Sequence, residues 1–203
     1  MINATIKKHF QEHISIVDAL LQTEGNALDA SASEIAASFL GGGKLYLFGS
    51  CVSAMTAHYA ATLFINNCRM PRPPLPAISL RNIYAHSKQT DNNDVYEKQI
   101  SALASPPDIV WGITTDSADD AVIRGLRTAA HNKIKTISMC GKENNALQGV
   151  SDIVISVNSS DPLRILELHT LVISAIADRI DEIMFNPNKE TSKPKGETRE
   201  TDY

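Results

Sequence analysis

The sequence predicts an α/β fold, a three-layer sandwich in which helices cover both faces of a doubly wound parallel sheet. Three observations support this prediction. Several short apolar runs lack polar alternation, which is typical of strands buried on both faces. Segments with helical periodicity separate these runs, as in parallel sheets with right-handed crossovers. The chain has 203 residues and is 43% hydrophobic, so it can bury the core of a single domain.

A pair of helices is expected ahead of the sheet, within residues 1–40. Apolar residues recur at helical spacing over residues 2–21 and again over 28–39. Gly25 and Asn26 predict a break between the two helices. The first helix carries an apolar stripe that is larger than a sheet edge needs: Ile2, Ile6, Phe10, Ile14 and Val17. A stripe of this kind favours a homo-oligomer, a tetramer or at least a dimer.

The first strand and the helix after it form the centre of the predicted fold. Residues 44–66 read KLYLFGSCVSAMTAHYAATLFIN, which predicts a buried strand, a tight loop after Gly49 and a helix. Ligands of open parallel sheets bind beyond the carboxyl ends of the strands, and free N–H groups at a helix start favour an anion. Ser50 and Ser53 are therefore candidate ligand-binding residues.

The rest of the chain continues the alternation of strands and helices. Further strands are expected at residues 77–80, 108–114, 134–140 and 152–157. Further helices are expected at residues 94–103, 118–131, near Asn145 and at 163–185. Asp161 and Pro162 give the last helix a cap and a favourable first residue. Residues 1–185 are thus predicted to form one domain with a helical extension at 1–40, and the polar residues 186–203 a disordered tail.

Composition excludes several classes of function. The net charge of -4 gives no electrostatic attraction to nucleic acid or to an anionic membrane. No apolar run approaches the roughly 20 residues of a membrane helix. Cys51, Cys68 and Cys140 are an odd number without metal-type spacing, and the N-terminus has no secretory leader. We therefore expect a cytoplasmic protein with reduced cysteines and neither metal nor cofactor.

Several segments carry a family resemblance in their order: GGGKLYLFGS, PLPAISL, DNNDVYEKQI, PPDIVWGITT, IKTISMCGKE, SDIVISV and RILELHTL. Together they resemble a sugar isomerase (SIS) domain of the phosphoheptose isomerase type, with a flavodoxin-like sheet. The N-terminal helix, DVYEKQISAL and DEIMFNP most resemble the branch of DnaA initiator-associating proteins. That resemblance implies a homotetramer, a sugar-derivative ligand and the replication initiator DnaA as partner.

The two ligand loops of the family are altered here. The family's first loop reads GNGGS or GNGTS, but this chain has GSCVS, in which the β-branched Val52 resists a positive φ. The second loop, STSGNS in the family, corresponds to residues 114–119. Its candidate ligand-binding residues are Thr114, Thr115, Asp116 and Ser117. At about 5 Å and a dielectric of ~20, a carboxylate costs a bound phosphate roughly 3 kcal/mol per charge pair. Alternatively, Asp116 or Asp119 caps the next helix.

The first crossover helix lacks the carboxylate that the family resemblance implies. Phosphoheptose isomerases use a His and a Glu on this helix for metal binding and proton transfer. Here the His position is Tyr59 in a gap-free alignment, or His58 if one residue is skipped. The Glu position then holds Leu63 or Thr62. Neither can transfer a proton next to a carbonyl group.

The last helix keeps only part of the family's RIQEhH pattern. Residues 164–169 read RILELH, so Leu166 replaces Gln while Glu167 and His169 remain as residual catalytic candidates. A single imidazole is a poor zinc site, and a buried helix histidine with a hydrogen-bonded partner is the simpler interpretation of His169.

These departures favour a catalytically inactive SIS-fold protein that binds DnaA, with a neutral or weakly acidic sugar as candidate ligand. Met184 and Phe185 are the candidate partner-binding residues, because an aromatic beside an adaptable Met is typical of an interface anchor. The alternative is that both fold back onto Ile180 or onto a neighbouring subunit. Two other functions stay open: a divergent D-sedoheptulose 7-phosphate isomerase, and a sugar sensor without a protein partner.

Overall fold

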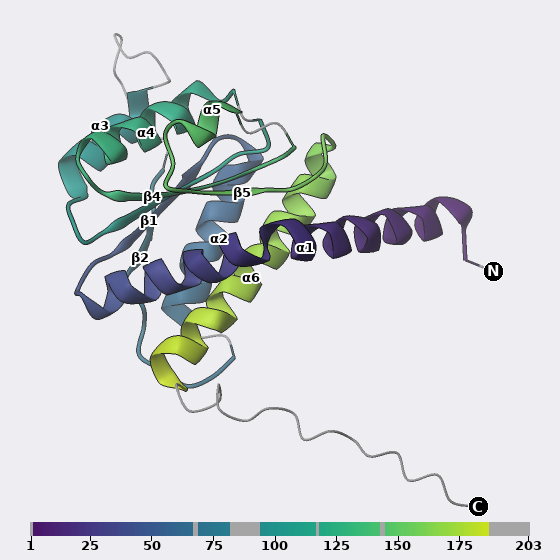
Figure 1. The fold of residues 1–203 in the computed structure, drawn as a ribbon, viewed down its shortest axis with the longest axis horizontal. Coiled ribbons are helices and arrows are strands. Elements are labelled where there is room, and N and C mark those ends of the chain that lie inside the picture. The colour runs from purple at the N-terminus through teal and green to yellow at the C-terminus, as the bar shows by residue number, and fades with distance from the viewer. Residues whose placement is uncertain (1, 67–68, 82–93, 117, 143–144, 187–203) are drawn as a thin grey trace, which may run out of the picture.

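A computed structural model describes residues 2–66, 69–81, 94–116, 118–142 and 145–186 (Figure 1). Five parallel strands form one sheet in the order β2-β1-β3-β4-β5. In chain order the strands are β1 (Leu45–Gly49), β2 (Ala77–Ser79), β3 (Ile109–Ile113), β4 (Lys135–Cys140) and β5 (Ile153–Ser156). The predicted parallel α/β sandwich is confirmed.

Helices cover both faces of this sheet (Figure 1). One face is covered by α1 (Ala4–Leu40), α2 (Val52–Asn66) and α6 (Pro162–Phe185). The other is covered by α3 (Val95–Leu103), α4 (Asp120–His131) and α5 (Asn145–Gln148). Alternate residues of the buried strands supply the two cores: on β1, Leu47 faces the first group of helices and Phe48 the second.

The predicted helix pair at the N-terminus is wrong, because α1 is one continuous helix of 37 residues. A glycine inside a helix costs only about 1 kcal/mol relative to alanine. Buried side chains lie on both sides of Gly25, with Leu20 before it and Ile35 after it, and both pack into the same core. This packing outweighs the local cost. The helix ends at Leu40, and in the glycines that follow it Gly42 takes a φ of 81°.

The first half of α1 extends beyond the rest of the domain (purple in Figure 1). Ile6, Phe10 and Ile14 of the predicted apolar stripe are 53%, 64% and 58% exposed. Val17 differs from them, since it is half-buried against the core. The chain therefore presents most of the stripe to solvent.

The start of α6 follows the signals in the sequence. The Asp161 side chain accepts a hydrogen bond of 2.9 Å from the backbone N–H of Leu163, and Pro162 is the first helical residue. From there α6 runs diagonally across one face of the sheet, beside α1 and α2 (Figure 1). The predicted tail lies outside the described residues, except for Asn186, which ends α6.

Candidate functional site

The turn between β1 and α2 holds two of the candidate ligand-binding residues. Gly49 has no room for a side chain, because a Cβ would meet the carbonyl oxygen at the end of β3. The backbone N–H of Ser53 donates to the carbonyl oxygen of Ser50 at 3.0 Å, which closes the turn. Cys51 takes the left-handed φ of 51°, so the strain expected at Val52 falls on its neighbour instead. Val52 is free to begin α2, and Ser53 is buried.

The loop after β3 gives its two carboxylates different roles. Asp119 caps α4, since its side chain accepts a hydrogen bond of 3.2 Å from the N–H of Val122. Asp116 accepts a bond of 2.9 Å from the N–H of Ala118. The buried Thr114 hydroxyl donates to the Asp116 carbonyl oxygen at 2.7 Å, which fixes the loop beside the strand. Ser117, also a candidate ligand-binding residue, lies outside the described residues.

A crevice of about 220 Å³ opens at the carboxyl ends of β3, β4 and β5. We call it the carboxyl-edge crevice; its lining residues are Thr115, Asp116, Gly141, Lys142, Ser159, Ser160 and Ile165. Of the candidate ligand-binding residues, Thr115 and Asp116 line it, whereas Ser50, Ser53 and Thr114 do not. The sequence reasoning missed Lys142, Ser159 and Ser160. Their positions directly after strands were a usable signal, because parallel strands end at the same edge of a sheet.

The crevice offers hydroxyl groups and one charge of each sign. Lys142 supplies an ammonium group, and Asp116 an exposed carboxylate. Hydroxyl groups of a sugar can exchange hydrogen bonds with Thr115, Ser159 and Ser160. The volume is below the roughly 300 Å³ at which pockets for drug-sized ligands begin, which fits part of a small polar ligand.

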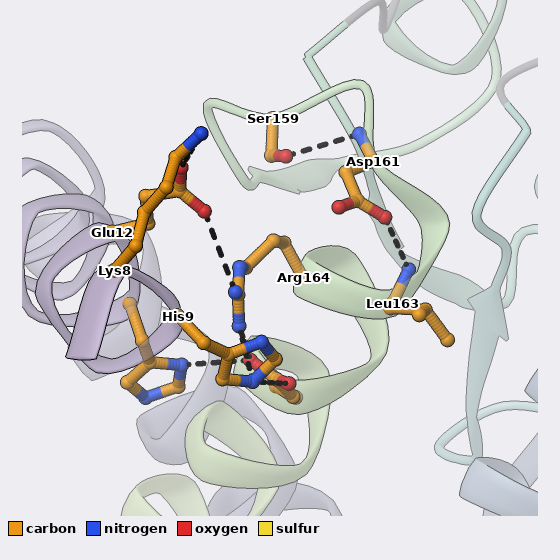
Figure 2. Close-up of polar contacts among 9 residues, drawn as sticks. Lys8, His9, Glu12, Ser159, Asp161, Leu163 and Arg164 are labelled. Atoms are coloured by element: carbon orange, nitrogen blue, oxygen red, sulfur yellow. Dashed lines mark hydrogen bonds and ion pairs between the residues drawn. The ribbon is translucent and has the colours of Figure 1, made fainter. Parts of the chain in front are cut away.

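Glu167 takes part in a charged cluster between α1 and α6 (Figure 2). Its carboxylate oxygens lie 3.0 Å from His9 Nε2 and 3.0 Å from His13 Nδ1, and Arg164 Nη1 donates to it at 2.7 Å. Partial burial alone would raise the pKa of Glu167, but the hydrogen bonds from Arg164 and His13 outweigh burial and lower it. Glu167 is thus a weak base tied to α1. The sequence reasoning missed His9 and His13, whose i, i+4 spacing places both on one face of α1.

His169 is completely buried under the carboxyl end of β4. Its Nε2 lies 3.4 Å from the carbonyl oxygen of Cys140, and Nδ1 has no hydrogen-bond partner among the described residues. Burial lowers the pKa of His169 to about 4, so the imidazole is neutral near pH 7. The structure keeps Glu167 and His169 on different sides of α6: one contacts the first helix, the other faces the sheet.

Tyr59, and not His58, faces α6. Both residues are exposed, but the Tyr59 hydroxyl lies 3.1 Å from the Ser174 hydroxyl of α6. Tyr59, Leu63 and Ser174 line a crevice of about 270 Å³ between the two helices. This placement agrees with the gap-free alignment, in which α2 brings a phenol and an apolar side chain to positions where the family uses His and Glu.

Met184 and Phe185, the candidate partner-binding residues, are half-buried at the end of α6 and pack against the core. Three acidic residues near them already have partners within the chain. Asp178 and Asp181 lie 3.0 and 2.6 Å from Arg69 and Arg72, and Glu182 lies 3.0 Å from Arg179. This packing corresponds to the alternative in which both side chains fold back. The acidic side chains near Met184 and Phe185 are thus paired with the chain's own arginines.

The described residues contain no group of three or more His, Cys, Asp or Glu side chains arranged to hold a metal ion. Within the same part of the chain, no helix is long and apolar enough to span a membrane. Cys51 is exposed and Cys140 is buried, and burial raises the Cys140 pKa to about 12. Cys68 lies outside the described residues.

Comparison with known proteins shows the family to which the chain belongs. Residues 8–141 match the family model described as "SIS domain", so the chain belongs to the SIS-domain family. Among its relatives, the phosphoheptose isomerase of Shewanella piezotolerans is 32% identical over 187 residues, which cover 89% of this chain and 95% of the relative. The phosphoheptose isomerase of Thermodesulfovibrio yellowstonii is 29% identical over 188 residues, which cover 91% and 94%.

A solved structure supports the same grouping. The phosphoheptose isomerase from Francisella tularensis superimposes with a TM-score of 0.82 at 27% identity, covering 88% of this chain and 97% of that one. The predicted resemblance to SIS domains of the phosphoheptose isomerase type is confirmed. The finer resemblance, to the initiator-associating branch, stays a prediction.

Proposed function

We propose that this protein is a divergent phosphoheptose isomerase that binds D-sedoheptulose 7-phosphate, or a closely related sugar derivative, in the carboxyl-edge crevice. The observation that carries the proposal is the match to relatives of that name along about nine tenths of both chains. Lys142 would attract the acidic group of the ligand, and Thr115, Ser159 and Ser160 would bind its hydroxyl groups.

The chemistry of the described side chains makes turnover the weak point of this proposal. Isomerisation of a ketose needs a group that takes a proton from one carbon and returns it to the next. Glu167 is a poor candidate for that base, because its pKa is lowered and its oxygens are occupied by His9, His13 and Arg164. On α2, Leu63 stands where the gap-free alignment expects a carboxylate.

A second candidate function is a non-catalytic SIS protein of the DiaA type, which binds the replication initiator DnaA as a homotetramer. The observation that favours it is the crevice between α2 and α6, where α2 contributes Tyr59, in contact with Ser174, and Leu63 but no acid–base carboxylate. Exposed Ile6, Phe10 and Ile14 would supply the contact between subunits.

One pair of measurements separates the two functions. The purified chain is assayed for isomerisation of D-sedoheptulose 7-phosphate, with and without added zinc, and in parallel for capture of purified DnaA. Turnover above a buffer blank that is lost on replacing Lys142 by Ala supports the isomerase. DnaA capture without turnover supports the second function, and the absence of both overturns both.

A further inference from the structure

Before Leu20, α1 has no fully buried residue, although Ile16 and Val17 are partly buried against the core. We call residues 4–19 the arm, because Leu20 is the first buried residue of α1. An isolated helix of this length is marginal in water, so its order depends on what it touches. Its polar contacts with the rest of the described chain join His9, Glu12 and His13 to two residues of α6 (Figure 2).

The two histidines contact α6 in different ways. His13 Nδ1 lies 3.0 Å from Oε2 of Glu167. His9 Nε2 lies 3.0 Å from Oε1 of Glu167 and also 2.7 Å from Nη1 of Arg164. A ring nitrogen that accepts a hydrogen bond from Arg164 has no proton to donate to Glu167. The geometry around His9 is therefore compatible with two arrangements, and the proton decides between them.

Protonation changes the partners within this cluster. Neutral His9 accepts from Arg164, whereas protonated His9 donates to Glu167 and leaves Arg164 to pair with Glu12, whose Oε2 is 3.5 Å from Nη2. Protonated His13 gives Glu167 a charged donor in place of a neutral one. Lys8, which pairs with Glu12 at 3.6 Å, is the other charged group of the arm at this contact. Histidine as a class changes its charge between about pH 5 and 8.

We propose that His9, His13 and Glu167 form a proton-dependent clamp that holds the arm against α6 more tightly in mild acid than in mild base. Oε2 of Glu167 already accepts a hydrogen bond of 2.7 Å from Arg164. Acidification makes His13 a second charged donor to Oε2 and His9 a charged donor to Oε1, and charge-assisted hydrogen bonds are roughly twice as strong as neutral ones. Glu167 stays ionised through this range because its pKa is lowered. His13 carries the clearer part of the effect, since the ring nitrogen of His9 that contacts Glu167 is shared with Arg164.

The clamp matters for the surface that the arm carries. Phe10 directly follows His9 and makes an edge-on ring contact with it, and Ile6 and Ile14 continue the exposed stripe. When the arm is held against α6, these side chains are presented in one fixed direction. The clamp thus makes the geometry of this apolar surface sensitive to pH.

Hydrogen exchange of the full-length protein tests the clamp. Protection factors for residues 4–16, corrected for intrinsic exchange, are compared at about pH 5.5 and about pH 8. We expect roughly fivefold greater protection in acid, which corresponds to about 1 kcal/mol. Glu167→Gln and His13→Asn should each remove most of this difference, whereas Asp18→Asn, an exposed charge change on the same arm, should keep it.

Two controls keep the test decisive. Protection of α4 reports on global stability and should not follow the arm. Oligomer mass is measured at both pH values. Equal protection of the arm at both pH values, or a full response in the Glu167→Gln variant, would overturn the proposal. If Glu167→Gln does not fold, the exchange data of His13→Asn test the clamp instead, because that substitution lies on the arm and not in the core of the domain.

Discussion

Replacing Asp116 by Ser should strengthen binding of a sugar phosphate in the carboxyl-edge crevice. Asp116 lines this crevice together with hydroxyl groups and the ammonium of Lys142. At about 5 Å and a dielectric of ~20, one charge pair costs roughly 3 kcal/mol. Asp116 is exposed, so solvent screening reduces that value to about 1 kcal/mol or less. Removing the charge should therefore tighten binding by roughly two- to fivefold.

Asp119→Ser provides the matched control, because it removes an equal charge from the same loop. Asp119 caps α4 and does not line the crevice, and Ser caps a helix about as well as Asp. Isothermal titration with D-sedoheptulose 7-phosphate measures both variants against the parent. We expect tighter binding for Asp116→Ser and little change for Asp119→Ser. Equal affinities for the parent and Asp116→Ser would refute the reasoning that charge repulsion weakens this site.

Three further predictions concern stability and assembly. Arg72→Ala should lower the free energy of unfolding by roughly 3 kcal/mol or more, because it removes the partner that lies 2.6 Å from the buried carboxylate of Asp181. A loss below about 1 kcal/mol, measured by urea unfolding, would contradict this prediction. Replacing Met184 and Phe185 together by Ala should lower the melting temperature and weaken DnaA capture; undiminished capture by an intact oligomer would move the partner contact elsewhere. Phe10→Asp should reduce the oligomer mass in light scattering, and an unchanged mass would show that the stripe is not a subunit contact.

The sheet could be predicted from the sequence because its signals are local. Each buried strand is a continuous apolar run, such as residues 109–113, and the capping signals at Asp161 lie next to the helix they start. The continuous α1 could not be predicted in this way. The loss of helix stability caused by Gly25 can be estimated from the sequence around it. The packing of Leu20 and Ile35 that outweighs this loss involves α6 and the sheet, which lie far away in the sequence.

Part of the candidate site could also be predicted from local signals in the sequence, whereas contacts between distant segments could not. The family resemblance pointed to the loop with Thr115 and Asp116, which lines the crevice. The rule that ligands bind beyond the carboxyl ends of parallel strands, applied to β4 and β5, would also have indicated Lys142 and Ser159. The contact of His13 with Glu167 joins residues 154 positions apart. It depends on where α1 crosses α6, which no periodicity in either helix specifies.

The proposed binding of a sugar derivative in the carboxyl-edge crevice can be tested by titrating the ¹⁵N-labelled protein with D-sedoheptulose 7-phosphate and recording backbone chemical shifts. We expect saturable shift changes centred on Thr115, Lys142, Ser159 and Ser160, whether or not the ligand is isomerised. No change up to the highest soluble ligand concentration would contradict this proposal, as would changes confined to the opposite edge of the sheet at residues 133–136 and 148–152.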